Sequence, residues 1–369
     1  MNPIFRCLFL LTLWWPGSAC LAQVMVPFVS DADRFMVFAE KRFLEIDDLP
    51  PSRYWSLNGA VLYQGADGGL AYFELEGRRT RVVERGRANE VRVSGDRAAW
   101  MVHDTLKVLR SGAGVVVATG VERFAVSDSL VAFIDGAGTA LNVLWRGQRI
   151  PMADIHEKSD DVLWAQGANT VTYHDRSRST ILAFQHGEVH MLMDSADIGV
   201  SYCGRDIIAY WDDIRDEFIV GWKEGRKRLS GLRPINAKAG DGVLAFVDGT
   251  LKLKYWDGTE VVTLTDSMPS DYWVEDRVVL YLEAGRLKMM APGGPIDVDE
   301  VVPEQWHVQG DGLVYLNANR ELWGIFSGER MRFGKEAAID GFEVFGDAVL
   351  YRSPKGPVTV IKDGRSFVF

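Results

Sequence analysis

The sequence predicts an all-β protein of repeated four-stranded units, which is the architecture of a β-propeller, and two observations predict it. An apolar strand ending in an aromatic residue follows a Gly/Asp-type turn nine times along the 369 residues. The first and last of these anchors are 288 residues apart over eight intervals, a mean period of 36 residues. Such a period indicates stacked supersecondary units. In addition, Asn/Asp-Gly pairs, which suit two-residue hairpins, separate short strands. The anchors are Tyr63, Trp100, Phe133, Tyr173, Tyr210, Phe246, Tyr281, Tyr315 and Tyr351.

Residues 1–22 have the composition of a secretory signal peptide. Residues 1–6 carry one positive charge, residues 7–15 form an apolar run, and small residues follow Pro16 up to Ala22. We expect cleavage after Ala22 and an exported mature protein, periplasmic or secreted. The apolar run is shorter than the roughly 20 residues that span a bilayer, so no transmembrane segment is expected. The alternative is an outer-membrane lipoprotein acylated at Cys20, although residues 17–19 lack the leucine of a lipobox.

The mature chain, residues 23–369, is expected to form one β-propeller domain, because no linker or composition shift interrupts it. Its first segment, residues 24–53, contains three strand-like stretches at 24–29, 35–39 and 42–46. These predict an abbreviated blade. Alternatively, one of them pairs with the C-terminal blade and latches the ring, and either use would protect an edge strand.

Nine repeats fill residues 54–369, and residues 240–270 show the unit most clearly. Residues 243–247 are an unbroken apolar run, as in a strand buried on both faces. Residues 251–255 alternate with period two, as in a half-buried strand, and residues 260–264 form a shorter strand after Asp257-Gly258. A connector with Pro269 leads to the next unit. The units begin near Tyr54, Val91, Phe124, Val162, Val200, Ile235, Tyr272, Trp306 and Phe342.

Four-stranded antiparallel units of this length suit propeller blades. At these residues the chain resembles the TolB-like and WD40-like propellers, whose blades also place a tight turn before a strand of the type Val-Leu-Ala-Phe and an Asp-containing hairpin after it. The resemblance covers nearly all of residues 54–369 but concerns pattern only. The Ser-Pro-Asp-Gly turn of TolB-like blades appears here as Gly-Asp-type turns such as Gly95-Asp96, and Trp211-Asp212 and Trp256-Asp257 fall at unlike places in their repeats. It implies an interaction scaffold and transfers no functional residues.

Blade number is left open by the repeats alone. Nine units plus a partial one exceed the usual four to eight blades of a propeller. One large ring and two smaller rings are both compatible with the sequence.

Composition narrows the partners. The formal net charge is −10, and it becomes −11 once Arg6 leaves with the signal segment. An acidic chain without a Lys/Arg cluster is not expected to bind nucleic acid. Cys203 is the one cysteine outside the signal segment, so no internal disulfide is expected, and its apolar surroundings predict a small buried hydrophobe.

The predicted site lies on the connectors that cross from the outer strand of one blade to the inner strand of the next, since binding residues gather on loops of a rigid scaffold. Trp55, Trp164, Trp273 and Trp306 follow these connectors on the inner strands, where they either line the site or fill the core between blades. The polar candidates for binding are Arg53, Arg87, His156, Glu157, Asp194, Arg233, Asp271 and Glu304.

Sharper motifs do not predict a metal, a cofactor or a catalytic residue. His186 and His190 are four residues apart, but Gly187 places them in a hairpin rather than on one helix face. Residues 199–203 start like a hydrolase nucleophile elbow but end in Cys203 without a strand-to-helix context. Four aspartates recur two residues after an anchor and are expected to cap their own hairpin turns rather than hold calcium; they are Asp135, Asp175, Asp212 and Asp248.

Two functional classes follow. The favoured one is a non-enzymatic module that presents a loop face to a protein or glycan of the cell envelope or the outside medium. The alternative is an enzyme that acts on a polysaccharide or glycoside from the axial channel, using either a pair of carboxylates or a His/Tyr/Arg set from different blades.

Overall fold

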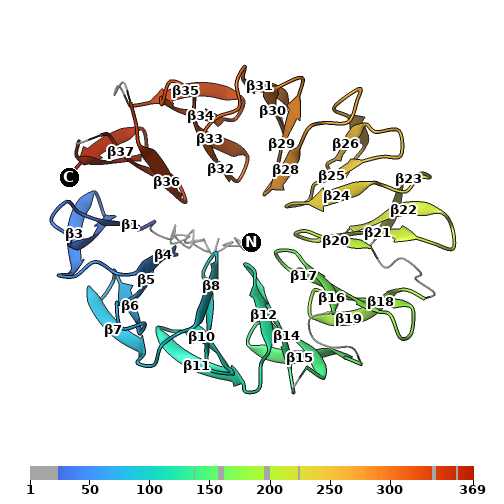
Figure 1. Cartoon of the computed structure of the whole chain (residues 1–369), viewed down its shortest axis with the longest axis horizontal. Helices are drawn as coiled ribbons and strands as arrows, with labels where there is room; N and C mark the ends of the chain where they lie inside the picture. Colours follow the sequence, from blue (N-terminus) through green and yellow to red (C-terminus); the bar gives the residue numbers. More distant parts are fainter. Residues whose placement is uncertain are drawn as a thin grey trace, which may run out of the picture.

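The computed structural model describes residues 24–136, 138–156, 162–194, 200–222, 225–334, 338–354 and 356–369, and the expected signal segment lies outside these ranges. The chain forms ten antiparallel sheets that are arranged as blades around one central axis (Figure 1). One ring of ten is therefore the correct alternative, and two smaller rings are not formed. Within the described part, no helix is long and apolar enough to cross a membrane.

Blade 1 has three strands and the nine others have four. Blade 1 contains β1 (Val26–Val29), β2 (Phe35–Ala39) and β3 (Arg42–Asp47). Blade 2 contains β4 (Arg53–Leu57), β5 (Ala60–Gln64), β6 (Leu70–Glu74) and β7 (Arg79–Glu84). Blade 3 contains β8 (Glu90–Ser94), β9 (Arg97–Val102), β10 (Thr105–Arg110) and β11 (Ala113–Ala118). Blade 4 contains β12 (Arg123–Val126), β13 (Leu130–Asp135), β14 (Ala140–Trp145) and β15 (Gln148–Asp154).

The remaining blades continue in the same order around the ring. Blade 5 contains β16 (Leu163–Gln166), β17 (Thr170–Asp175), β18 (Thr180–Gln185) and β19 (Glu188–Met193). Blade 6 contains β20 (Ser201–Cys203), β21 (Ile207–Asp212), β22 (Glu217–Trp222) and β23 (Gly225–Ser230). Blade 7 contains β24 (Asn236–Ala239), β25 (Leu244–Val247), β26 (Leu253–Trp256) and β27 (Val261–Thr263). Blade 8 contains β28 (Tyr272–Glu275), β29 (Val278–Glu283), β30 (Arg286–Ala291) and β31 (Gly294–Asp299). Blade 9 contains β32 (Gln305–Gln309), β33 (Gly312–Leu316), β34 (Leu322–Phe326) and β35 (Glu329–Phe333). Blade 10 contains β36 (Gly341–Phe345), β37 (Ala348–Arg352), β38 (Val358–Lys362) and β39 (Arg365–Val368).

Each four-stranded blade runs from the axis outward in sequence order. The first strand lines the centre of the ring and the fourth lies at the rim (Figure 1). The second strand is the most buried, as β13, β17 and β21 show with every residue buried. All nine predicted aromatic anchors lie on second strands and are at most 4% exposed, which confirms the predicted strand register.

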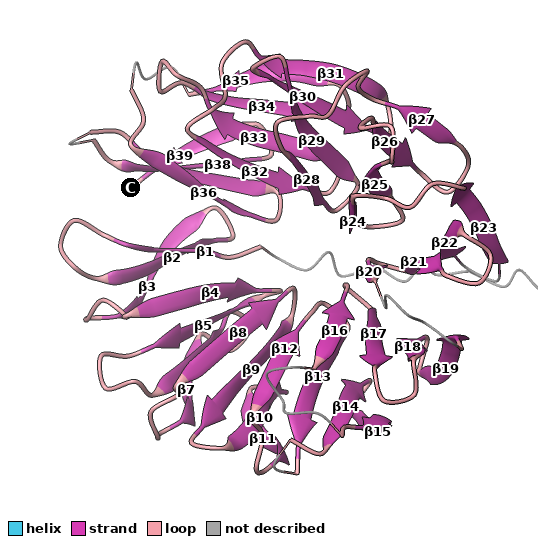
Figure 2. Ribbon diagram, turned by 45° about the vertical axis from the view of Figure 1, so that its right-hand side comes forward, coloured by secondary structure: helices cyan, strands magenta, loops and turns pink. Residues whose placement is uncertain are grey.

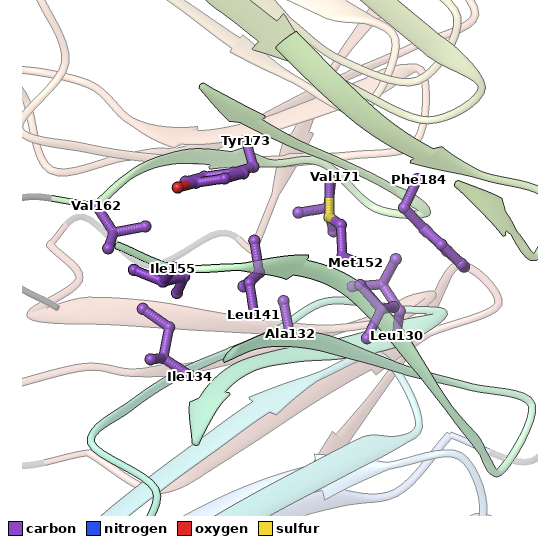
Figure 3. Packing of buried hydrophobic residues seen from close by; sticks show 11 residues of the cluster. Leu130, Ala132, Ile134, Leu141, Met152, Ile155, Val162, Val171, Tyr173 and Phe184 are labelled. Atoms are coloured by element: carbon purple, nitrogen blue, oxygen red, sulfur yellow. The ribbon is translucent and has the colours of Figure 1, made fainter. Parts of the chain in front are cut away.

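The core lies between neighbouring blades. Leu130, Ala132 and Ile134 of blade 4 pack in one cluster with Val171 and Tyr173 of blade 5, and Figure 3 shows these side chains meeting between the two sheets. The second strand of each blade is buried on both faces, so it has an apolar run, whereas third strands such as β30 alternate buried and less buried residues. Trp164 and Trp306 also pack against such clusters, so these inner-strand tryptophans contribute to the core between blades.

Blade 1 corresponds to the second, third and fourth strands of the other blades. Its β2–β3 pair has a register shift between Phe35 and Met36, the same shift that six other blades have where the third strand pairs with the fourth. Phe28 on β1 then occupies the place of Tyr63 on β5, because Val29 and Gln64 begin equivalent turns. Phe28 is therefore a tenth aromatic anchor, 35 residues before Tyr63.

The inner edge of β1 is covered by side chains of its neighbours. In six other blades the residue before the inner strand, such as Ser52 or Asp340, donates its backbone N–H to a carbonyl at the end of the second strand. In blade 1 the equivalent carbonyl, Val29 O, accepts a hydrogen bond from the Arg352 guanidinium of blade 10. Arg352 also lies 3.6 Å from Asp31.

Aromatic packing closes the ring on the outer side. Phe28 contacts Phe369 with ring centroids 5.2 Å apart, and Phe38 contacts Phe367 at 4.8 Å. Figure 2 shows β1–β3 lying as a separate sheet between β4 and the strands of blade 10. The abbreviated blade is thus confirmed, and the alternative of a strand paired with the C-terminal blade is wrong, because in the described residues β36–β39 form a sheet of their own.

Candidate functional site

The ring has two faces that differ in the loops they carry. The outer-to-inner connectors and the turns between second and third strands share one face, which we call the connector face. Backbone hydrogen bonds join them, as from Ala88 N to Gly68 O and from Ile339 N to Arg320 O, both 3.0 Å. The turns between first and second strands lie at the opposite ends of the inner strands, on what we call the turn face.

The predicted binding residues lie on seven different connectors or at the strand start that follows them. Glu157 lies outside the described residues, and the seven others are exposed. Glu304 forms an ion pair with Arg320 at 3.0 Å, and Asp271 accepts a hydrogen bond from the backbone of Tyr272 at 2.7 Å. Within the described residues, no hydrogen bond or ion pair joins two of the predicted residues. The role of these candidates in binding stays a prediction. The seven candidates that lie within the described ranges are Arg53, Arg87, His156, Asp194, Arg233, Asp271 and Glu304.

Exposed apolar side chains gather on the connector face. Among the described residues fifteen large apolar side chains are exposed, and seven of these lie on outer strands or directly after the last one. The other eight lie on connectors or on second-to-third strand turns, and none lies on the turn face. They are Leu49, Ile214, Leu232, Ile235, Leu251, Met268, Val301 and Val302. Their aliphatic character was not predicted, because only polar residues and tryptophan were expected to bind on the connectors.

The turn face holds a cavity of about 400 Å³, lined by polar and apolar residues from inner strands and turns of blades 3 to 8. Arg205, in the turn of blade 6, lies 2.5 Å from Asp128 of blade 4 and 3.2 Å from Asp241 of blade 7. The same turn is joined to blade 7 by the backbone hydrogen bond from Arg205 N to Gly240 O at 2.9 Å. Arg205 therefore ties together turns that are two blades apart.

The carboxylates of the turn face link neighbouring blades. Asp96 accepts hydrogen bonds from Asn58 in the preceding blade, and Asp276 accepts one from Gly310 N at 2.6 Å. Asp241 differs, because burial raises its pKa, aided by the charge of Asp276 and opposed by Arg205. The recurring Gly-Asp-type turns of the sequence were a signal for these carboxylates, although the sequence prediction drawn from them concerned only the positions of hairpins.

A second cavity, of about 700 Å³, lies between inner strands on either side of blade 1. Its lining includes Val24, residues of β4, and residues of β32 and β36. Near it the Tyr54 hydroxyl donates a hydrogen bond to Glu343 at 3.2 Å, which joins blade 2 to blade 10 past the three-stranded blade. Glu343 is open to the channel, yet the blades around it displace enough water to raise its pKa.

The recurring buried aspartates serve their own turns. Asp175, Asp212 and Asp248 each accept hydrogen bonds from two backbone N–H groups two to four residues ahead, which confirms the predicted capping. Asp135 differs, because its carboxylate bonds to Asn142 and Arg149. In the described part of the chain no cluster of three His, Cys, Asp or Glu side chains is arranged for a metal ion.

Comparison with known proteins identifies the family. The model of the 10-bladed beta propeller domain matches residues 19–367. No curated protein matches the chain. Similar solved structures include the computationally designed Ika8 protein (13% identity, TM-score 0.37, covering 76% of this chain and 94% of that one). They also include the CRINKLY WD40 ectodomain of the receptor kinase ACR4 from Arabidopsis thaliana (8% identity, TM-score 0.39, 65% and 94%).

A third similar structure is PorZ, a surface component of the type-IX secretion system of Porphyromonas gingivalis (11% identity, TM-score 0.26, covering 93% of this chain and 57% of that one). The family match extends over nearly the whole chain and agrees with the ten sheets. The chain therefore belongs to the 10-bladed beta propeller domain family.

Proposed function

We propose that this protein is an exported, non-enzymatic interaction module whose connector face binds a partner protein. One observation carries the proposal: eight exposed aliphatic side chains lie on that face, and none on the turn face, within the described residues. Exposed apolar groups rimmed by polar residues mark sites where proteins associate. The signal-like residues 1–22 and the TolB-like pattern of the blades support a location outside the cytoplasm.

A protein suits this face better than a glycan. Glycan sites stack sugar rings on aromatic side chains, whereas the exposed apolar groups on the connectors are leucine, isoleucine, valine and methionine. The inner-strand tryptophans that would offer such stacking are packed against the core, as Trp164 and Trp306 show. The predicted polar residues Arg233, Asp271 and Glu304 then supply the rim of a protein interface.

The carboxylates of the turn face also fit a structural role. Asp128 and Asp241 share one guanidinium, and Asp96 and Asp276 bond to neighbouring turns. Groups held in this way connect blades to one another. The alternative, a glycoside-acting enzyme, is favoured by Asp241 and Glu343, because a pKa raised by burial beside a cavity is typical of a general acid.

The proposal is tested with residues 23–369 as bait against membrane and secreted fractions of the source organism. Two matched variants accompany the wild type: Leu232→Ser with Met268→Ser on the connector face, and Arg205→Ser on the turn face. We expect a stoichiometric protein partner that the connector variant loses and the turn variant retains, scored by mass spectrometry. Loss of the partner in the turn variant alone would reject the connector face.

The enzymatic alternative has its own test. Wild type and Asp241→Asn are incubated with polysaccharides and aryl glycosides, and released reducing sugar is measured. We expect no release with either protein. Turnover by the wild type that disappears in Asp241→Asn would replace the proposed function with hydrolysis in the channel.

A further inference from the structure

The turn between β25 and β26 of blade 7 holds an exposed leucine in a left-handed conformation. Leu251 has φ +66° and is 47% exposed. In L-residues this conformation brings Cβ close to the following carbonyl oxygen, so it is rare outside glycine, asparagine and aspartate. Strain of this kind persists where the surrounding structure imposes it, and it concentrates at functional sites.

Three other blades form the same turn with different residues at this position. In each, the turn closes with two backbone hydrogen bonds, such as Asp248 N to Lys252 O and Leu251 N to Asp248 O in blade 7. The equivalent residues are Asp33 in blade 1, Gly68 in blade 2 and Arg320 in blade 9, all with positive φ. Arg320 uses its position to bond to Glu304 and to the carbonyls of Ile339 and Asp340. Leu251 stands out as an apolar side chain held in this position and left in solvent.

Connectors on both sides bring more apolar surface to Leu251. A Cβ on Gly249 would lie 3.5 Å from Cβ of Leu232, so the preceding connector lies against the turn. On the other side Thr265 Oγ1 accepts a hydrogen bond from Leu253 N at 3.0 Å and donates one to Ser267 O at 2.6 Å. The four exposed side chains of this region, which we call the blade 7 patch, are Leu232, Ile235, Leu251 and Met268.

The charge around the blade 7 patch is not symmetrical. The connector from blade 7 to blade 8 carries the exposed carboxylates of Asp266 and Asp271, and the exposed Glu300 lies one connector further on, after β31 of blade 8. Lys252 pairs with Asp266 at 3.5 Å, whereas within the described residues no ion pair is formed by Asp271 or Glu300. Toward blade 6 the exposed Arg233 lies between Leu232 and Ile235 on the connector. The patch is therefore apolar at its centre, basic on the blade 6 side and acidic on the blade 8 side. A ligand that fits it combines apolar anchors with cationic groups.

We propose that the blade 7 patch is the docking site for a basic amphipathic segment of the partner protein. Apolar residues of that segment cover Leu232, Leu251 and Met268, and its lysine or arginine side chains reach Asp271 and Glu300. This inference rests on the proposed function, because it assigns a location and a chemical class to the same partner. It also gives a role to an apolar side chain that is exposed at a turn where blades 1, 2 and 9 carry aspartate, glycine and arginine.

The probe is a fluorescein-labelled 12-residue peptide of leucine and lysine, titrated with residues 23–369 and followed by anisotropy. Matched peptides of leucine with glutamate and of serine with lysine separate the apolar from the cationic requirement. We expect the leucine–lysine peptide to bind at least tenfold more tightly than either control, and its affinity to fall as salt rises. Equal affinity for all three peptides would overturn the proposed chemistry.

Variants then locate the site. Leu251→Gly is expected to weaken the leucine–lysine peptide at least tenfold while the melting temperature stays at or above that of the wild type, because glycine accepts the positive φ. Asp271→Lys is expected to weaken the same peptide and to reduce the salt dependence. Asp33→Gly makes the matched change in the equivalent turn of blade 1 and should leave binding unchanged. Unchanged binding in Leu251→Gly and Asp271→Lys would overturn the assignment to this patch.

The partner found with the wild-type bait separates this inference from the proposed function. A stoichiometric partner retained by Leu251→Gly and Asp271→Lys would leave the interaction module standing and would overturn the blade 7 patch. Peptide binding that both variants lose, without a protein partner in any fraction, would support the patch and count against the proposed function.

Discussion

The aspartates at the ends of the second strands of blades 5, 6 and 7 act within the turns that contain them. Asp248 is 2% exposed and accepts hydrogen bonds from two backbone N–H groups of its own turn, while Lys254 Nζ lies 2.8 Å away. Burial alone would raise the pKa of Asp248, but hydrogen bonds from Lys254, Thr250 and the backbone outweigh it and lower the pKa to about 2. The folded state therefore stabilises the ionised form of this carboxyl group more than the unfolded chain does.

Asp248→Asn is expected to lower the free energy of unfolding by about 2 kcal/mol at neutral pH. Because the pKa is lower in the folded state, the stabilisation is present above about pH 4 and disappears as the pH falls through about 2. Urea unfolding at pH 7 and at pH 2.5 measures this difference. Asp363→Asn in an exposed turn is the control, and an equal effect of both variants at pH 7 would contradict the argument.

The surroundings of Cys203 control the reactivity of its thiol in a similar way. Its Sγ lies 3.3 Å from Thr172 Oγ1, and burial raises the pKa of Cys203 to about 11. The nucleophilic thiolate is therefore scarce at pH 8. We expect iodoacetamide to label the native protein slowly at pH 8 and the urea-unfolded protein at once, as mass spectrometry would show. Cys203 is only partly buried and lines the turn-face cavity, so the prediction of a fully buried residue is wrong in degree. Rapid labelling of the native protein would show that this partial exposure makes the thiol reactive.

At the scale of the element, the second strand of each blade contributes most to the core. Phe246 on β25 and Phe28 on β1 are both fully buried and belong to clusters between different pairs of blades. The sequence period identified Phe246 but not Phe28, because a four-residue strand with Pro27 at its centre lacks the apolar run of the other anchors. Both residues fill the core between two neighbouring blades.

Phe246→Ala and Phe28→Ala should therefore each cost about 3–5 kcal/mol of unfolding free energy, through lost burial and the cavity that remains. Chemical denaturation with intrinsic tryptophan fluorescence measures it. Met331→Ala on the exposed outer strand β35 is the control and should change stability little. A loss below about 1 kcal/mol for Phe28→Ala would mean that blade 1 is not packed as part of the ring.

On the scale of the whole molecule, the ring closes through side chains rather than through a shared sheet. Arg352 donates to Val29 O, and these residues are 323 positions apart in the chain. Ser56 Oγ donates to Met25 O at 2.7 Å from the other side. Pro27 lies between these two carbonyls and has no N–H to leave unsatisfied. The edge of the three-stranded blade is thereby protected against pairing with another chain.

Arg352→Met should open this seam locally. It removes the donor to Val29 O and the contact with Asp31, with an expected cost of about 1–3 kcal/mol. Amide hydrogen exchange should accelerate in β1 and β2 more than in β25. Arg365→Met on the rim strand β39 is the matched control. Uniform exchange across all blades in Arg352→Met would show that the seam unfolds only with the whole ring.

Much of the fold could be predicted because its signals are local. Hairpin turns, alternating strands and buried aromatic anchors depend on residues close together in sequence, so the 36-residue period, the four strands per unit and the second-strand anchors were all confirmed. The candidate site was predicted only in outline. The connector residues Arg233 and Asp271 stand beside the blade 7 patch, yet the apolar centre of that patch, including Leu251, was missed.

The sequence by itself determined the repeat, the β class and the core of each blade, since these follow from turn chemistry and from burial within one unit. Only the tertiary structure decided that ten blades form one ring, that blade 1 has three strands within the described residues, and that the connectors with Leu232 and Met268 flank the turn with Leu251. Those properties depend on contacts between segments that are far apart in the chain or on backbone angles such as the positive φ of Leu251. Local patterns do not encode which distant loops meet, because ring closure sets those distances.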